Sequence, residues 1–195
     1  MSSKKLIGIT GGIGAGKSIV CSIIHAMGYP VFYSDKAAKN ILNTDNNAKN
    51  KMRAVFGDEA YLNNELNRPY ISDKIFNDQK LLSAINEIVH PAVRKAFADW
   101  ASEQTTDLVF NEAAILFETG AYKLYDANVL VVAPEAVRIE RVMQRDNISK
   151  DAVLERMNKQ WSDSQKEKLA DHLINNDNAS MLIPQVIELI DKLKL

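Results

Sequence analysis

The sequence predicts an α/β protein in which a five-stranded parallel sheet lies between two layers of helices. Three short apolar runs support this prediction, at residues 6–9, 108–110 and 128–133. Such runs are typical of parallel strands that are buried on both faces. Stretches with apolar residues at helical spacing lie between the runs, and this alternation builds a parallel sheet. At 195 residues, the chain has the length of one domain with a small inserted subdomain.

The segment after the first strand carries the most specific motif. Residues 11–18 read Gly-Gly-Ile-Gly-Ala-Gly-Lys-Ser, which fits a glycine, four residues, then Gly-Lys-Ser. Glycine lets successive N–H groups point at one anion, and the following helix presents its N-terminus to that anion. We expect this helix to end at Gly28, a natural C-cap, because Pro30 prevents its continuation. The motif therefore predicts the three-layer P-loop nucleoside-triphosphate hydrolase fold, with Lys17 on the β- and γ-phosphates and Ser18 on Mg²⁺. The residues expected to contact nucleotide here are Gly12, Ile13, Gly14, Ala15, Gly16, Lys17, Ser18 and Ile19.

A carboxylate follows the second strand, which we expect at residues 31–33. In sheets of this kind, ligands bind beyond the carboxyl ends of the strands, so Asp35 should face the phosphate loop. There it could accept the proton of an attacking hydroxyl, orient that hydroxyl, or touch the water shell of a metal. Alternatively, Ser34 or Asp35 caps the helix that begins at Lys36, and both roles can coexist.

Residues 36–106 separate the second strand from the third and read mainly as helices. We expect turns at Gly57-Asp58 and Asn63-Asn64, a loop at Arg68-Pro69, and a helix break at His90-Pro91, with His90 in a structural or capping role. A simple crossover needs only one helix, so the length suits a cap that binds and covers a second substrate. A helical decoration without such a role is the alternative.

Further charged and polar groups follow the later strands. Glu112 ends the third strand and could hold Mg²⁺ through water, or be an ordinary polar strand end. The helix after the fourth strand carries Arg138, Arg141 and Arg145 on one face, which suits triphosphate oxygens or a solvated basic surface. Asn175 and Asn176 end the last strand, near where an adenine could sit.

Composition narrows the classes of function. With 46% hydrophobic residues, 25% charged residues and a net charge of −1, nothing suggests a nucleic-acid or membrane-surface binder. The single cysteine, Cys21, forms no intramolecular disulfide and should be a core residue. The sequence shows no signal peptide and no membrane-length apolar run, so we expect a cytoplasmic protein. The expected organisation is a core of residues 1–35, 107–134 and 171–195, an acceptor-binding insertion of residues 36–106 and a lid of residues 135–170.

The ordered set of motifs resembles the dephospho-coenzyme A kinase family. The chain departs from the family pattern at Ile19, where Thr is usual, at Tyr33-Ser34-Asp35, which replaces Asp-Ala-Asp, and at Ala114, which replaces Pro. None of these changes removes a predicted catalytic group. The matching stretches are ITGGIGAGKS at 9–18, Asp35 with the following Lys-Ala-Ala, His90-Pro91, Glu112 through AILFE at 114–118, RVMQRD at 141–146 and ADHLINND at 170–177.

The resemblance implies transfer of a phosphoryl group from ATP·Mg²⁺ to the ribose 3′-hydroxyl of dephospho-CoA, the last step of coenzyme A biosynthesis. It implies that Lys17 and Ser18 bind ATP·Mg²⁺, that Asp35 is the base and that Arg141 is the lid arginine on the phosphates. Arg145 and Asn175 join the expected nucleotide contacts. We expect a monomer or weak homo-oligomer. Two alternatives stay open: another small-molecule or nucleoside monophosphate kinase, and a nucleotide-dependent switch ATPase.

Overall fold

The computed structural model describes residues 4–76 and 78–195 and divides the chain into two compact units. The first unit comprises Met1–Tyr33 and Gln104–Leu195, and the second comprises Ser34–Glu103. The strands of the first unit are β1 (Lys5–Thr10), β2 (Val31–Tyr33), β5 (Leu108–Glu112), β6 (Ala127–Val132) and β7 (His172–Asn175). Its helices are α1 (Lys17–Ala26), η2 (Ala121–Leu124), α6 (Glu135–Asp146), α7 (Lys150–Asn158), α8 (Asp163–Glu167) and α9 (Leu182–Lys194).

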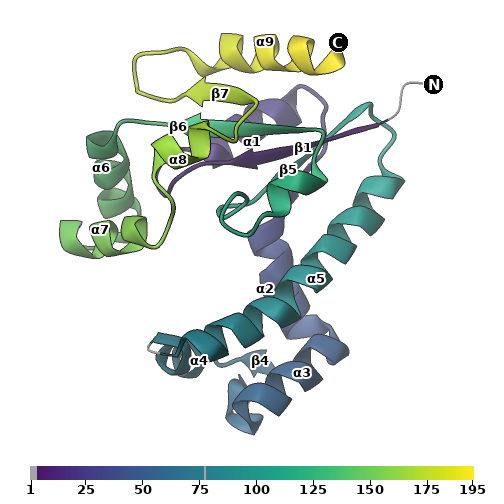
Figure 1. Cartoon of the computed structure of the whole chain (residues 1–195), viewed down its shortest axis with the longest axis vertical. Coiled ribbons are helices and arrows are strands. Elements are labelled where there is room, and N and C mark those ends of the chain that lie inside the picture. Colours follow the sequence, from purple (N-terminus) through teal and green to yellow (C-terminus); the bar gives the residue numbers. More distant parts are fainter. Residues whose placement is uncertain (1–3, 77) are drawn as a thin grey trace. The chain divides into compact units, whose positions relative to one another are not determined.

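The five strands form one parallel sheet in the order β2-β5-β1-β6-β7, as Figure 1 shows for the first unit. This confirms the predicted α/β fold with a five-stranded parallel sheet. The register aligns Glu112 with both Ile9 and Tyr33, and Val132 with Asn175. The carboxyl ends of the strands therefore gather at one edge of the sheet, where ligands bind in open α/β folds.

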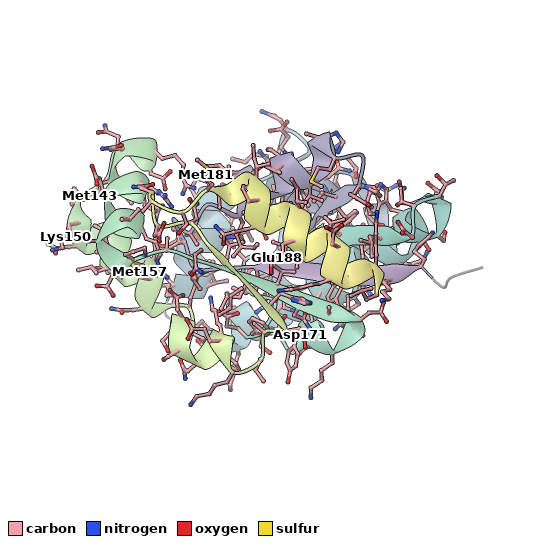
Figure 2. All side chains as sticks on the ribbon, turned by 90° about the horizontal axis from the view of Figure 1, so that it is seen from above. Met143, Lys150, Met157, Asp171, Met181 and Glu188 are labelled. Atoms are coloured by element: carbon pink, nitrogen blue, oxygen red, sulfur yellow. The ribbon has the colours of Figure 1, made fainter. Side chains whose placement is uncertain are left out.

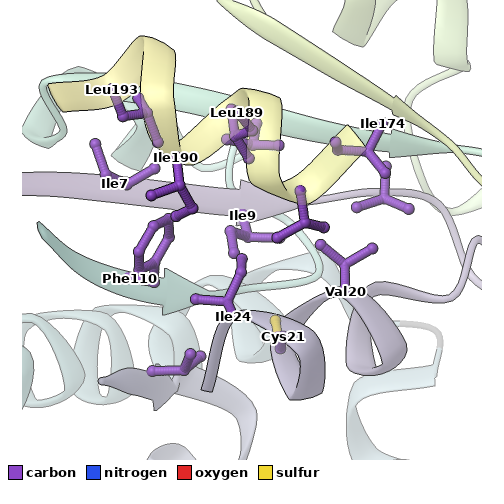
Figure 3. Packing of buried hydrophobic residues seen from close by; sticks show 14 of the residues in the cluster. Ile7, Ile9, Val20, Cys21, Ile24, Phe110, Ile174, Leu189, Ile190 and Leu193 are labelled. Carbon is purple, nitrogen blue, oxygen red and sulfur yellow. The ribbon is translucent and has the colours of Figure 1, made fainter. Parts of the chain in front are cut away.

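One face of this sheet is covered by α1 and α9, which also contact each other. Figure 3 shows Ile7 and Ile9 of β1 clustered with Val20 of α1 and Leu189 and Ile190 of α9. Each of these side chains contributes about 1.5–3 kcal/mol on burial. On the opposite face, Leu116 and Tyr125 lie against Gly8 of β1, and α8 contacts β6. The apolar stripe of α9 consists of Val186, Leu189, Ile190 and Leu193, at the spacing of one helix face.

The end of α1 explains the direction of the chain into β2. Gly28 has φ +92° and donates its N–H to His25 O at 3.0 Å, and the Tyr29 N–H reaches Ile24 O at 3.3 Å. These two bonds form a Schellman motif, for which glycine is favoured because of its positive φ. The predicted end of this helix at Gly28 is confirmed.

The helices α6 and α7 pack as a hairpin around Ile139, Val142 and Val153. Figure 2 shows Met143, Lys150 and Met157 on this hairpin.

None of the helices in the described part of the chain combines the length and the apolar composition that a membrane span needs.

The second unit is a helical subdomain with a small hairpin. Its core contains Met52, Phe56, Tyr61 and Ile71. Its elements are α2 (Ser34–Thr44), α3 (Asn46–Phe56), η1 (Asp58–Ala60), β3 (Tyr61–Leu62), β4 (Glu65–Leu66), α4 (Arg68–Phe76) and α5 (Gln79–Glu103).

Local signals in the second unit succeeded at both predicted turns and failed at two prolines. Gly57, with φ of 80°, ends α3 just before η1 begins at Asp58, as predicted. Asn63 and Asn64, with φ of 48° and 67°, form the turn between β3 and β4 as predicted. The loop expected at Arg68-Pro69 is wrong, because α4 begins there and a first-turn proline loses no helical hydrogen bond. The break expected at Pro91 is also wrong. Packing along α2, α3 and α4 keeps α5 helical through this position and outweighs the missing hydrogen bond.

Candidate active site

The phosphate loop, residues 11–18, joins β1 to α1 and leaves a row of hydrogen-bond donors unused. Within the described part of the chain, the N–H groups of Gly14, Gly16, Lys17 and Ser18 have no protein acceptor. Three neighbouring donors are taken. The Ala15 N–H bonds to Gly12 O at 3.0 Å, the Ile19 N–H to Gly16 O at 3.1 Å, and the Ile13 N–H to Gln160 Oε1 at 2.8 Å. Four donors beside a helix N-terminus form a cradle for an anion.

Two glycines give the loop this shape. Gly14 has φ +80° and Gly16 has φ +91°, a region that L-residues with a side chain rarely adopt. A Cβ on Gly14 would lie 2.6 Å from the carbonyl oxygen of Arg138, and one on Gly16 would lie 2.0 Å from Asn176 Nδ2. The loop therefore needs glycine at both positions because of backbone conformation and because of its close neighbours.

Lys17 and Glu112 stand side by side at the base of the loop. Lys17 Nζ donates to Gly11 O at 3.1 Å and lies 3.7 Å from Glu112 Oε1. Both side chains are largely buried, with exposed fractions of 13% and 14%. Ser18 follows in the first turn of α1. A hydroxyl and a carboxylate are hard oxygen donors of the kind Mg²⁺ binds, so Ser18 and Glu112 fit the predicted metal.

Cys21 lies one turn further along α1 and is fully buried, which confirms its expected place in the core. Burial raises the pKa of its thiol to about 12. The Glu112 carboxylate acts in the same direction, and Lys17 opposes it. The pKa of Tyr33 is also raised, first by burial and then by Cys21 and Glu112. Both groups therefore stay neutral at physiological pH.

The opposite side of the loop is braced by Asn176 and Arg141. Asn176, directly after β7, donates from Nδ2 to Ala15 O at 2.8 Å, and its N–H bonds to Val132 O at 2.8 Å. Arg141 Nη1 donates to Gly14 O at 3.3 Å, and Nη2 donates to Asn176 O and Oδ1 at 3.1 and 3.2 Å. Nη2 also contacts Asn178 Oδ1. The structure thus brings the predicted lid arginine to the phosphate loop.

The three arginines of α6 have three different partners. Arg138 is buried and donates both bonds from Nη1 to the Asp163 carboxylate, at 2.6 and 2.8 Å. Arg141 lies on the loop. Arg145 is largely exposed and donates to its neighbour Asp146 at 2.8 and 3.2 Å. Hydrogen bonds from Arg145, followed by its charge and that of Arg156, hold the pKa of Asp146 below its usual range. The Arg145 hydrogen bonds thus go to protein in this structure.

Two other predicted site residues lie at the ends of their own elements. Asn175 is exposed at the end of β7, and its backbone N–H and C=O bond to the Gln185 side chain at 2.8 and 2.9 Å. Asp35 is the second residue of α2 and is exposed. Because α2 begins at Ser34, Asp35 lies in the first helical turn, where a carboxylate complements the helix dipole.

Sequence reasoning missed two contacts of the loop. Asn176 was expected near an adenine, whereas the structure places its amide against Ala15 O. Gln160 was not singled out, because a polar residue between two helices carries no local signal of its partner. The only signal in the sequence is that both residues are polar and can pair with backbone groups of the loop.

A matched pair of glycine substitutions tests the brace. Gly16 and Gly28 have nearly the same φ, but a Cβ on Gly28 would meet no described atom within 4 Å. Gly28→Ala should cost about 1 kcal/mol of unfolding free energy and leave nucleotide affinity unchanged. Gly16→Ala must also displace the Asn176 amide, so nucleotide affinity measured by calorimetry should fall by about tenfold or more. Equal affinity in the two variants would contradict the brace.

Comparison with known proteins places the chain in a family. The family model for dephospho-CoA kinase matches residues 5–181. The dephospho-CoA kinase of Bacteroides fragilis is 38% identical over 185 residues, covering 94% of this chain and 90% of the relative. That of Porphyromonas gingivalis is 39% identical over 189 residues, covering 96% and 94%.

Solved structures agree with the fold. A Thermus thermophilus crystal structure superposes with a TM-score of 0.89 at 30% identity, covering 99% of each chain. A dephospho-CoA kinase from Campylobacter jejuni gives a TM-score of 0.71 at 24% identity, covering 97% of each chain. A shikimate kinase from Bacteroides thetaiotaomicron shares the fold, with a TM-score of 0.59 and 11% identity. The fold is that of the P-loop kinases, and the chain belongs to the dephospho-CoA kinase family.

Proposed function

We propose that this protein transfers the γ-phosphoryl group of ATP to the ribose 3′-hydroxyl of dephospho-CoA, giving coenzyme A and ADP. The proposal is carried by the phosphate loop, in which four backbone donors have no protein acceptor in the described chain. The chain belongs to the dephospho-CoA kinase family, and such a loop suits the oxygens of a nucleoside triphosphate.

The loop and Lys17 hold the phosphates in this account. The N–H groups of Gly14, Gly16, Lys17 and Ser18 bind phosphate oxygens, and Lys17 Nζ moves from Gly11 O to the β- and γ-phosphates. Ser18 and Glu112 would hold Mg²⁺, which neutralises charge on the phosphates when it is bound. Arg141, now on Gly14 O and Asn176, has its guanidinium beside the same donors and would add a bidentate contact to phosphate.

The acceptor side of the proposal rests on the second unit and on Asp35. The acceptor oxygen attacks the γ-phosphorus, the bond from that phosphorus to the β-phosphate oxygen breaks, and ADP leaves. Asp35 orients the hydroxyl and takes its proton. Its place two residues beyond the end of β2 supports this role. The helices of residues 36–106 bind the rest of the acceptor, and residues 135–170 act as the lid. Arg145 and Asn175 are proposed as further nucleotide contacts.

An acceptor panel tests the proposed reaction. ADP release from ATP·Mg²⁺ would be measured with dephospho-CoA, AMP, CMP, adenosine, shikimate and gluconate, with Lys17→Ala as the inactive blank. We expect turnover with dephospho-CoA alone and coenzyme A as the product. Turnover of another acceptor without turnover of dephospho-CoA would contradict the proposal and leave a different small-molecule kinase. ADP release that is independent of any acceptor would favour a switch ATPase.

The role of Asp35 has its own test. Asp35→Asn keeps the size of the side chain but removes the proton acceptor, so kcat should fall by about 10²–10⁴ while KM for both substrates changes little. Asp73→Asn, at another exposed carboxylate of the second unit, is the matched control and should keep wild-type kcat. A folded Asp35→Asn enzyme with kcat within threefold of wild type would show that Asp35 is no base.

A further inference from the structure

Gln160 connects the segment between α7 and α8 to the phosphate loop. Its Oε1 accepts the Ile13 N–H at 2.8 Å, across 147 residues of sequence. Gln160 also donates its own backbone N–H to Met157 O at 3.0 Å, which holds it at the end of α7. The Ile13 N–H of the phosphate loop is therefore hydrogen-bonded to a side chain of residues 135–170, the segment expected to form the lid.

Ile13 is tied to the same segment a second time, through its side chain. The side chain packs against the cluster of Ile139, Val142 and Val153, which lies between α6 and α7. The Ile13 side chain thus contacts the α6–α7 hairpin, and the Ile13 N–H contacts Gln160, just after the end of α7. Because Gly14 follows directly with a positive φ, the position of the Ile13 peptide sets the direction in which the next N–H groups point.

The residues after Gln160 are hydrogen-bonded to other parts of the first unit, which gives the loop a defined point of attachment. The Trp161 N–H donates to Glu118 Oε1 at 3.1 Å, and Lys166, with 0% exposure, pairs with the same oxygen at 3.0 Å. Ser162 and Gln165 form a capping box that starts α8. Asp163 receives both bonds from the buried Arg138. We name residues 160–167 the anchor segment.

We propose that Gln160 is a positioning residue for nucleotide binding, acting through the Ile13 N–H. It removes this one donor from the phosphate cradle and fixes the loop so that the four remaining donors converge on the phosphates. Without this bond, the loop must be ordered by the nucleotide itself, and part of the binding free energy is lost. This inference rests on the proposed kinase function, because the ligand of the loop is taken to be ATP.

The decisive variant is Gln160→Met, which keeps the length of the side chain and replaces the oxygen with a weak sulfur acceptor. Amide exchange at Ile13, followed by NMR without nucleotide, should become about tenfold faster than in wild type. The Kd for ATP·Mg²⁺ from calorimetry without acceptor should rise about five- to tenfold, the equivalent of one net hydrogen bond. KM for dephospho-CoA should stay within twofold, since the anchor segment and loop serve the nucleotide.

Two further variants distinguish the loss of the hydrogen bond to Ile13 from a change in side-chain packing. Gln160→Glu keeps an oxygen at the same reach and should keep slow exchange at Ile13. Gln144→Met, on the exposed face of α6 where the Gln144 amide donates to Glu140 Oε1 at 3.2 Å, should behave as wild type in every assay. A similar loss of stability in Gln160→Met and Gln144→Met, without a change at Ile13, would overturn the proposal.

The outcomes also separate this inference from the proposed reaction. If wild type binds ATP and Gln160→Met weakens that binding, the positioning role holds even when dephospho-CoA is not phosphorylated. If dephospho-CoA is phosphorylated with wild-type KM for ATP in Gln160→Met, the reaction stands and the positioning role is wrong. Unchanged exchange at Ile13 in Gln160→Met would likewise overturn it.

Discussion

The structure depends on keeping four backbone N–H groups free of protein acceptors at one place. Donors of this kind are costly to bury, and nearly all such groups in proteins are paired. Here the N–H groups of Gly14, Gly16, Lys17 and Ser18, beside the N-terminus of α1, have no protein acceptor in the described chain. The four residues are partly or fully exposed, so a ligand can reach these donors. The rest of the first unit maintains this arrangement. The sheet fixes both ends of the loop, and residues from distant parts of the chain hold its carbonyls.

The loop is held from two sides by residues that are far apart in sequence. Asn176 and Arg141 bind the carbonyls of Ala15 and Gly14, and Gln160 accepts the N–H of Ile13. Carbonyl oxygens that point at phosphate would repel it, so bonds that direct them elsewhere favour anion binding. Lys17 beside Glu112 adds a cation and a carboxylate in the same place, which suits a phosphate with its metal.

The sequence predicted what local chemistry decides. The phosphate loop, the apolar strands and the end of α1 at Gly28 follow from residues that are neighbours in the chain. Pro91 shows where this reasoning fails, because tertiary packing along α5 overrides a local helix-breaking signal. The contacts of Gln160 and Asn176 with the loop span 147 and 161 residues, so no spacing rule reveals them. The second unit's helices were predictable in outline, whereas their ends depended on packing.

The most direct test of the phosphate cradle is an NMR titration of the amide signals with ATP·Mg²⁺. The account predicts large shifts for Gly14, Gly16, Lys17 and Ser18, because these N–H groups gain phosphate acceptors. It predicts much smaller shifts for Ile13 and Ala15, whose N–H groups already bond to Gln160 Oε1 and Gly12 O. Shifts at Ile13 as large as those at Gly16, or no shifts at the four donors under saturating nucleotide, would contradict it.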